Sequence, residues 1–308
     1  QYGDQHYAVV DLGSNSFHLL IIRLSDNKIK KVNKVKRKVR LAAGLNEHLE
    51  LSTDAINRGL DCLDLFAKHL TTIPLSNIRI VATATLRIAN NRHDFLNKAN
   101  EILPLEIKLL SGEQEATTIY SGVAHTSISN LTQKQLVIDI GGASTELIIG
   151  QGFTANKAIS LNLGCVSFRE KYFTDGQLTE ENFTAAINAA SHIIKPTSTD
   201  FIKFGWQSVV GSSGTIRALA EILSSRQQKI TITADFLEEI KQKLIDCKSI
   251  ENITFEGLRA DRSPVLASGL SILIALFTQL NITELNLSCG ALREGLLFSL
   301  LPENTVLV

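Results

Sequence analysis

The sequence predicts an α/β protein made of two related lobes, and three features of the chain support this prediction. Residues 138–149 repeat the pattern of residues 10–22. Apolar segments rich in β-branched residues alternate with segments of helical spacing, which is typical of an α/β architecture. A stretch rich in Ser, Thr, Asn and Gln, residues 125–134, precedes the second copy. We therefore expect a first lobe over residues 1–124 and a second lobe over residues 125–308.

Each copy of the repeat has an apolar run, a tight turn and a second apolar run, which predicts a β-hairpin. The two copies are offset by 128 residues, and the aligned pairs are Asp11 with Asp139, Gly13 with Gly141, Ser16 with Ser144 and Leu19 with Leu147. Such turns can direct several backbone N–H groups at one anion, because glycine has no Cβ in the way. The repetition therefore indicates two lobes that face one phosphate chain.

The rest of the first lobe is predicted from the spacing of its apolar residues. An extended segment follows the hairpin and runs to Leu41. Ser52 can cap the next helix at its first turn. The expected elements are a helix over 52–70, a strand over 78–85, a helix over 94–102, a strand over 107–110 and a helix that starts at Ser111.

The second lobe is predicted in the same way. We expect a last helix over about 295–308, which can pack either on this lobe or back on the first lobe. Residues 266–280 are apolar but contain Ser, Gly and Gln, so we interpret them as a buried helix too short and too polar to span a membrane. The expected elements are a hairpin over 135–150, strands over 159–163, 208–210 and 285–287, a turn over 164–167, and helices over 179–194, 216–223, 234–247 and 264–280.

Composition narrows the classes of partner. Lys plus Arg and Asp plus Glu both number 31, so net charge indicates neither nucleic acid nor another polyanion. Eight basic residues nevertheless lie between Lys28 and Arg40. They form either a strand edge protected by lysines or a basic rim that attracts a phosphate-rich ligand. The four cysteines are far apart and form no CxxC pair, which favours reduced thiols and a cytoplasmic location.

A third glycine- and hydroxyl-rich turn, Gly211-Ser-Ser-Gly-Thr215, separates an expected strand from an expected helix. Phosphates bind well at helix N-termini, since unpaired N–H groups and the helix dipole favour negative charge there. Gly211, Ser213, Gly214 and Thr215 are therefore candidate phosphate ligands. The alternative is an ordinary strand-to-helix turn with serine as the cap.

Several acids are candidates for chemistry. Asp11 and Asp139 either stabilise their turns or hold Mg²⁺ beside a phosphate cradle. Hydrolysis of a phosphoanhydride also needs a base for the attacking water. Glu113, Glu115 and Glu146 are the candidates for this role. The alternative for an acid at the start of a helix, such as Glu113, is compensation of the helix dipole.

Basic and hydroxyl side chains complete the candidate site. Arg87 follows an expected strand and can bind phosphate oxygens in a bidentate manner. Arg293 is a second candidate, with a surface ion pair as its alternative. We interpret the hydroxyl groups of Ser14, Ser16 and Ser144 as phosphate ligands rather than nucleophiles, because no Gly-x-Ser-x-Gly elbow is present.

Seven short motifs cover nearly the whole chain: residues 11–18, 82–87, 111–116, 139–147, 164–167, 211–215 and 290–295. Their sequences are DLGSNSFH, ATATLR, SGEQEA, DIGGASTEL, GCVS, GSSGT and GALREG. Together they resemble the exopolyphosphatase/guanosine pentaphosphate phosphohydrolase (Ppx/GppA) family. The resemblance implies an actin-like (ribonuclease H-like) duplicated two-lobe fold with an interdomain cleft.

The resemblance also implies Mg²⁺-dependent hydrolysis of a terminal phosphoanhydride. It assigns the general base to Glu115, a second acidic role in placing water or metal to Glu146, and a metal-side carboxylate to Asp139. Arg87 would anchor a phosphate. The residues that would cradle phosphates are Ser14, Asn15, Gly141, Gly142, Ser144, Gly214 and Thr215.

The family has two branches, the guanosine pentaphosphate enzymes and the exopolyphosphatases, and the resemblance to each implies a different main substrate. The segment Arg37–Asn46 and the Gly-Gly-Ala-Ser-Thr turn resemble the guanosine pentaphosphate enzymes, and Ala143 stands where exopolyphosphatases usually have glycine. We expect removal of the terminal phosphate of guanosine pentaphosphate, with polyphosphate as an additional or alternative substrate. A superfamily kinase and a nucleotide sensor without turnover are remote alternatives. We expect no nucleic-acid or membrane partner, and a homodimer stays open.

Overall fold

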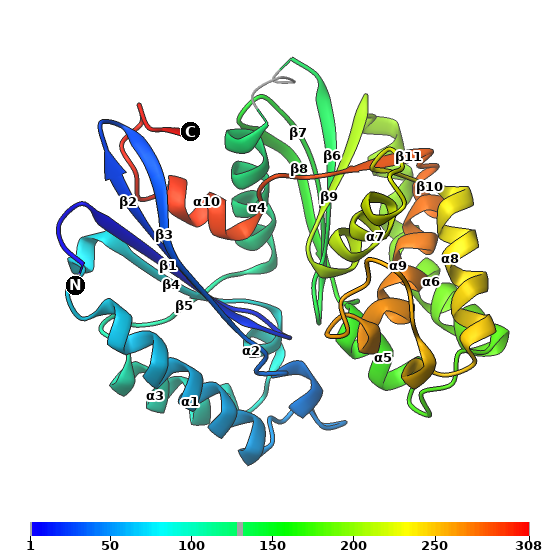
Figure 1. The fold of residues 1–308 in the computed structure, drawn as a ribbon, viewed down its shortest axis with the longest axis horizontal. Coiled ribbons are helices and arrows are strands. Elements are labelled where there is room, and N and C mark those ends of the chain that lie inside the picture. Colours follow the sequence, from blue (N-terminus) through cyan, green and yellow to red (C-terminus); the bar gives the residue numbers. More distant parts are fainter. Residues whose placement is uncertain (1, 128–131, 308) are drawn as a thin grey trace. The chain divides into compact units, whose positions relative to one another are not determined.

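The computed structural model of the protein describes residues 2–127 and 132–307, so the middle of the expected linker, residues 128–131, lies outside the described residues. The chain divides into two compact units (Figure 1). Unit 1 is formed by residues 1–126 and 292–308, and unit 2 by residues 127–291.

Unit 1 is built on a mixed sheet with the strand order β12-β3-β2-β1-β4-β5. Strands β1, β2 and β3 pair antiparallel, and β4 and β5 extend the sheet in parallel from β1. Parallel pairs require crossover connections, which helices supply here. The strands are β1 (His6–Leu12), β2 (Phe17–Ser25), β3 (Lys28–Arg37), β4 (Ile78–Ala82), β5 (Lys108–Leu109) and β12 (Val306–Leu307).

Helices cover both faces of the sheet of unit 1, with α1 and α3 on one side and α4 and α10 on the other (Figure 1). Ser52 caps α1 as predicted, because its Oγ accepts a hydrogen bond from the Ala55 N–H at 3.2 Å. Ser111 and Gln114 form a reciprocal capping box at α4. The helices are α1 (Thr53–Leu70), α2 (Ala84–Ile88), α3 (Arg92–Ile102), α4 (Gly112–Thr126) and α10 (Leu292–Phe298), with 3₁₀ turns at Ala42–Gly44 and Leu75–Asn77.

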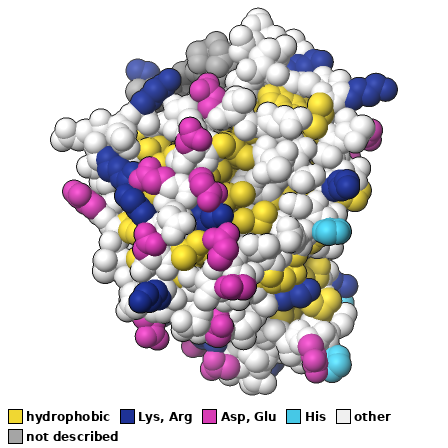
Figure 2. Space-filling view, turned by 90° about the vertical axis from the view of Figure 1, so that its right-hand side faces the viewer, with side chains coloured by type: hydrophobic (Ala, Val, Ile, Leu, Met, Phe, Trp, Pro, Cys, Tyr) yellow, Lys and Arg dark blue, Asp and Glu magenta, His cyan; other side chains and the backbone are white. Residues whose placement is uncertain are grey.

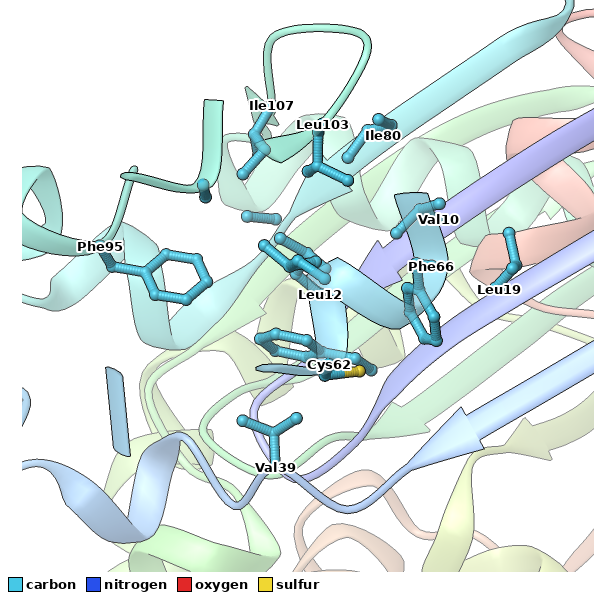
Figure 3. Close-up of a cluster of buried hydrophobic side chains, with 14 of the residues drawn as sticks. Val10, Leu12, Leu19, Val39, Cys62, Phe66, Ile80, Phe95, Leu103 and Ile107 are labelled. Carbon is cyan, nitrogen blue, oxygen red and sulfur yellow. The ribbon is translucent and has the colours of Figure 1, made fainter. Parts of the chain in front are cut away.

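The core of unit 1 lies between the sheet and the pair α1 and α3 (Figure 3). Alternate residues of β1, Val10 and Leu12 among them, point into it, since side chains of a strand alternate between faces. Phe66 of α1 and Phe95 of α3 fill the centre and are fully buried. Burial in this core raises the pKa of the Cys62 thiol to about 12, which keeps it protonated.

Unit 2 is built on a second mixed sheet, with the order β10-β11-β9-β6-β7-β8. Its strands are β6 (Lys134–Ile140), β7 (Thr145–Gln151), β8 (Thr154–Leu161), β9 (Ser208–Ser212), β10 (Thr231–Thr233) and β11 (Glu284–Leu287). Five strands of each sheet share one topology, because β3-β2-β1-β4-β5 and β8-β7-β6-β9-β11 have antiparallel and parallel pairs at the same places. The predicted duplicated α/β fold is confirmed.

Helix α9 is the central helix of unit 2, where it contacts α5, α6, α7, α8 and β6. Residues 260–280 are long and apolar enough to cross a membrane by composition, contrary to our expectation. Of the apolar 18-residue window within this stretch, 67% is buried inside the protein, which is typical of a core helix. The helices are α5 (Cys165–Tyr172), α6 (Glu180–Phe204), α7 (Gly214–Ser225), α8 (Ala234–Cys247) and α9 (Ser263–Leu280), with a 3₁₀ turn at Ile250–Asn252.

Some predicted boundaries are wrong. Helix α6 continues through Pro196 to Phe204, because its packing on α9 offsets the hydrogen bond that proline removes. Residues 164–167 begin helix α5 rather than forming a free turn, and β8 starts at Thr154. Strand β4 ends at Ala82, so Arg87 lies on α2 and not behind a strand. The short edge strands β10 and β12 escaped prediction.

The face of the protein on which α8 lies carries interspersed acidic, basic and apolar side chains (Figure 2). Lys241 pairs with Glu238 at 2.9 Å, and Lys243 pairs with Glu239 at 3.0 Å, both along α8. Exposed pairs of this kind contribute only tenths of a kcal/mol. This face therefore shows no field of a single sign that would attract a polyanion.

The contact between α4 and α10 predicts one stability effect. A Cβ on Gly295 of α10 would overlap the backbone carbonyl of Thr118 on α4, so these helices touch only because residue 295 is glycine. We expect Gly295→Ala to destabilise the protein by about 1–3 kcal/mol, the usual range for overpacking. Gly3→Ala is the control, since a Cβ there meets nothing within 4 Å. Urea unfolding measures both, and equal stability of the two variants would contradict this packing.

Candidate functional site

Both copies of the repeat form the predicted hairpin, and their turns close in the same way. The Gly13 N–H donates to the Ser16 carbonyl at 3.2 Å, and the Gly141 N–H donates to the Ser144 carbonyl at 2.9 Å. A Cβ at Gly13 or Gly141 would lie within 3.0 Å of the same carbonyl oxygen. A Cβ at Gly13 would force the turn to shift, whereas a Cβ at Gly141 would make a tight contact, so both turns favour glycine.

The turn of unit 2 is fixed from behind by the N-terminus of α5. The Cys165 N–H donates to the Gly141 carbonyl, and the Val166 N–H donates to the Gly142 carbonyl, both at 2.9 Å. The C=O and N–H of one trans peptide unit point in opposite directions. The N–H groups of Gly142 and Ala143 therefore point away from α5. Two aligned amide donors of this kind can bind an oxyanion.

The turn of unit 1 is held by the segment that follows β3. The Ala42 N–H donates to the Ser14 carbonyl at 2.9 Å, and the Arg40 N–H donates to the Asn15 carbonyl at 3.0 Å. By the same peptide geometry, the N–H groups of Asn15 and Ser16 point away from that segment. Each unit thus presents a turn whose carbonyls are engaged on one side and whose amides are directed to the other.

The register of the strands places the charged candidates in two matching rows. Asp11 pairs with His18, and His18 pairs with Lys36 across β1, β2 and β3. In unit 2, Asp139 pairs with Glu146, and Glu146 pairs with Ser160 across β6, β7 and β8. Residues directly opposite on neighbouring strands share a face of the sheet. One row therefore holds an acid with basic partners, and the other holds two acids and a hydroxyl.

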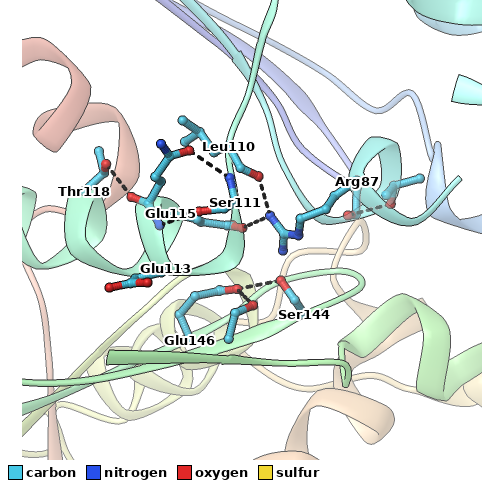
Figure 4. Close-up of polar contacts among 12 residues, drawn as sticks. Arg87, Leu110, Ser111, Glu113, Glu115, Thr118, Ser144 and Glu146 are labelled. Atoms are coloured by element: carbon cyan, nitrogen blue, oxygen red, sulfur yellow. Dashed lines mark hydrogen bonds and ion pairs between the residues drawn. The ribbon is translucent and has the colours of Figure 1, made fainter. Parts of the chain in front are cut away.

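Glu146 is almost completely buried, with 1% of its surface exposed. The hydroxyls of Ser144 and Ser160 both donate to its Oε1 atom, each at 2.7 Å (Figure 4 labels Ser144 and Glu146). These hydrogen bonds replace part of the hydration that a carboxylate loses on burial. The two hydroxyls also fix the plane in which the carboxylate lies.

Asp139 is the second buried acid of unit 2, and its Oδ2 accepts a hydrogen bond from Ser212 Oγ at 3.0 Å. Its Cβ lies about 5 Å from that of Glu146, the usual spacing of directly paired residues. No group of three or more His, Cys, Asp or Glu side chains suited to a metal occurs within residues 2–127 and 132–307. Mg²⁺ needs only one or two carboxylates besides water and phosphate oxygens, so Asp139 and Glu146 fit this ion.

The third predicted turn joins β9 to α7 and lies next to Asp139 in the sheet, because Asp139 pairs with Ser212. Ser213 has a φ of 78°, which is unusual for a residue with a side chain and marks a constrained turn. Gly211 lies against the side chains of Ile216 and Leu285, and a Cβ on Gly211 would overlap the Ile216 side chain. Gly214 then begins α7, with its first amides at the turn.

Thr215 and Thr85 occupy matching places in the two units, since each is the second residue of the helix after a parallel strand. Thr85 Oγ1 donates to Ser14 Oγ at 2.7 Å in unit 1. The counterpart of Ser14 in unit 2 is Gly142, which has no hydroxyl. Thr215 Oγ1 is buried without a hydrogen-bond partner among the described residues. In unit 2 the Thr215 hydroxyl is thus available to donate to a ligand, whereas in unit 1 the Thr85 hydroxyl donates to Ser14.

Arg262 is a candidate that sequence reasoning missed. A Cβ on Gly214 would overlap the Arg262 guanidinium, so this cation lies directly against the start of α7. Burial lowers the pKa of Arg262, with the charge of Asp261 opposing that effect. Arg262 precedes α9 in a segment with no recognisable motif, and only its tertiary contact with Gly214 identifies it.

Glu115 forms a buried ion pair in unit 1 (Figure 4). Arg87 Nη1 on α2 donates to Glu115 Oε2 on α4 at 3.0 Å, and also to the Leu110 carbonyl at 3.0 Å. Glu113, two residues earlier, is exposed. The structure therefore separates the two acids that the sequence places together. It also gives Arg87 a protein partner in place of the phosphate expected for it.

The structure gathers most of the predicted residues within each unit. In unit 1, Asp11, Ser14, Asn15 and Ser16 line one turn, and Ser14 contacts α2 through Thr85. In unit 2, the residues of two adjacent turns come together: Asp139, Gly141, Gly142, Ser144, Glu146, Gly211, Ser213, Gly214 and Thr215. Arg293 lies at the start of α10, and in the sequence it is far from the hairpin turns of units 1 and 2.

Comparisons with known proteins give consistent results. The model of the Ppx/GppA phosphatase family matches residues 20–304. The chain is 50% identical over 297 residues, or 96% of its length, to guanosine-5'-triphosphate,3'-diphosphate pyrophosphatases of Vibrio cholerae and Aliivibrio fischeri. It spans 59% of the length of these relatives.

Solved structures support the fold. An exopolyphosphatase from Cytophaga hutchinsonii superposes with a TM-score of 0.84 at 19% identity, over 96% of this chain and 97% of that one. A Ppx/GppA family member from Aquifex aeolicus superposes with a TM-score of 0.76 at 24% identity, over 96% and 97% of the two chains. At these identities the likeness establishes the shared fold.

The ion pair of Arg87 and Glu115 predicts strong coupling in a double-mutant cycle. Arg87→Met leaves a buried carboxylate without its cation, which is expected to cost about 3 kcal/mol of stability. The same change in a Glu115→Gln background should cost at least about 1.5 kcal/mol less, because no charge is left unpaired. Urea unfolding of the four proteins measures the coupling, and additive effects would contradict the pair.

Proposed function

We propose that this chain, which belongs to the Ppx/GppA phosphatase family, hydrolyses the terminal phosphoanhydride of guanosine pentaphosphate. The products are guanosine tetraphosphate and phosphate. The observation that carries the proposal is the turn of unit 2, with amides directed away from α5 and two buried carboxylates on the adjoining strands. The choice of substrate follows the name printed for the relatives at 50% identity.

Glu115 is proposed as the general base, and its environment defines what it must do. A carboxylate in an ion pair with arginine is a weak base, because the cation stabilises its ionised form. A substrate phosphate offers Arg87 a second anionic partner with bidentate geometry. We infer that binding of the phosphate draws Arg87 from Glu115. The released carboxylate then accepts a proton from water as the water attacks phosphorus.

Unit 2 is proposed to bind the phosphate groups. The Gly142 and Ala143 amides, the first amides of α7 and the Thr215 hydroxyl are donors for phosphate oxygens. Arg262 adds a positive charge at the start of α7. Asp139 and Glu146 would hold Mg²⁺, which offsets the charge of the phosphate oxygens when it is bound.

Release of phosphate from the ends of polyphosphate is the second candidate function. The chemistry at phosphorus is the same, and the family model covers both kinds of enzyme by its description. Parallel assays of phosphate release from guanosine pentaphosphate and from polyphosphate of defined length separate the two. The proposal requires the nucleotide to have the higher kcat/KM, and removal of Mg²⁺ by a chelator to abolish turnover.

A cytoplasmic location is proposed together with this activity. All four cysteines are free thiols, with Cys62 and Cys165 buried. Burial raises the pKa of Cys165 to about 11, against the opposing effect of Arg262. Such unpaired thiols are usual in a reducing compartment.

Replacement of Glu115 tests the role of the base. Glu115→Gln is expected to lower kcat by about 10²- to 10⁴-fold, the usual contribution of general base catalysis. Affinity for guanosine pentaphosphate should stay the same or increase, because Arg87 no longer has a competing carboxylate. Glu113→Gln, an exposed acid on the same helix turn, is the matched control and should leave kcat unchanged. Loss of binding at an unchanged rate would refute the assignment.

The basic segment on β3 predicts a dependence on salt. Lys36 pairs with His18 in the row that begins at Asp11, and Lys38 follows the strand. Neutralising both lysines to Gln should raise KM at low ionic strength, with the difference from the wild type shrinking as salt screens the charges. An unchanged KM at low salt would favour the other interpretation, a protected strand edge.

A further inference from the structure

We propose that Ser160 is a positioning residue, which orients the Glu146 carboxylate for the reaction. This proposal rests on the proposed function, since it assigns Ser160 a part in that same site. Ser160 lies on β8, outside every motif that the sequence analysis identified. Its place in the site comes only from the pairing of β8 with β7.

The geometry of the contact is defined by the strand register. Glu146 and Ser160 are directly opposite in the antiparallel pair β7–β8, so their side chains share a face. Ser160 Oγ donates to Glu146 Oε1 at 2.7 Å. The irregularity of this strand pair falls between Ile149 and Gly150, several residues away. The hydroxyl is therefore presented by regular, fully paired sheet.

Two hydroxyls on one carboxylate oxygen have a specific effect. Burial of a charged carboxylate is costly unless hydrogen bonds replace its lost water, and Glu146 is 1% exposed. Ser144 and Ser160 supply that replacement from two different segments, one from the turn and one from the neighbouring strand. Because both donate to Oε1, the carboxylate cannot rotate without losing a hydrogen bond. The orientation of its second oxygen is thereby set.

The equivalent position in unit 1 explains why a neutral donor is suited here. His18 is the counterpart of Glu146 in unit 1, and it pairs with Lys36 on the neighbouring strand. Glu146 pairs with Ser160 instead. A lysine opposite Glu146 would form an ion pair and offset the negative charge of the carboxylate. A hydroxyl fixes the carboxylate but adds no charge. The hydrogen bond from Ser160 therefore orients Glu146 without reducing the negative charge that attraction of a cation or polarisation of water requires.

Ser160 is also better suited to a test than Ser144. Ser144 closes the hairpin turn through its carbonyl and lies beside the proposed phosphate-binding amides. Ser160 is on a different strand, and its side chain donates a hydrogen bond to Glu146. A change at Ser160 therefore separates orientation of the acid from damage to the turn.

The test compares Ser160→Ala and Ser160→Thr with the wild type in steady-state hydrolysis of guanosine pentaphosphate. Loss of one hydrogen bond to a charged group is expected to lower kcat about 10- to 100-fold in Ser160→Ala, with KM nearly unchanged. Ser160→Thr keeps a hydroxyl and should restore most of kcat. Thr154→Ala removes an exposed hydroxyl from the same strand and should behave as the wild type.

Stability is measured on the same proteins, together with Glu146→Gln and the double variant Ser160→Ala/Glu146→Gln. The proposal requires Ser160→Ala to lower kcat even though thermal unfolding shows that the variant is folded. It also requires the effects of Ser160→Ala and Glu146→Gln on kcat to be non-additive in the double variant. A wild-type kcat in Ser160→Ala, or no rescue by a folded Ser160→Thr, would overturn it. A wild type that releases no phosphate would instead overturn the proposed function and Ser160's role with it.

Discussion

The site of unit 2 depends on one constraint, the antiparallel pairing of β6 with β7 around a tight turn that the Gly141 N–H closes. This register sets Asp139 opposite Glu146 on one face of a buried sheet. The same turn has its carbonyls bound to the start of α5, which directs its amides to the other side. Acidic side chains and amide donors are thereby fixed next to each other. A slip of one residue would turn both acids to the opposite face.

The two units share one strand topology but differ in the side chains at matching positions. Both keep the closing hydrogen bond of the turn and the threonine at the start of the following helix. In unit 1 the Thr85 hydroxyl donates a hydrogen bond to Ser14. In unit 2 Gly142 stands in the place of Ser14, and Thr215 Oγ1 has no hydrogen-bond partner among the described residues. The row that holds Glu146 in unit 2 holds His18 in unit 1. The two units thus differ in the side chains that surround their matching turns.

Much of the fold could be predicted from local signals. The hairpins follow from paired apolar runs around Asp-x-Gly turns, and Ser52 marks the start of α1 through its cap. The contacts that give the site its chemistry could not be predicted, because they join residues far apart in the chain. Arg87 reaches Glu115 across 28 residues, and Arg262 reaches Gly214 from the segment that precedes α9. Ser160 has no local signal at all, since strand register alone brings it to Glu146.

In the proposed reaction, the glycine turns bind the terminal phosphate while Glu115 directs water to it. A crystal structure of the Glu115→Gln variant with guanosine pentaphosphate and Mg²⁺ is the decisive test. We expect the terminal phosphate on the amides of Gly142 and Ala143, Mg²⁺ near Asp139, and residue 115 within reach of a water in line with phosphorus. A nucleotide bound elsewhere, or a terminal phosphate remote from residue 115, would contradict it.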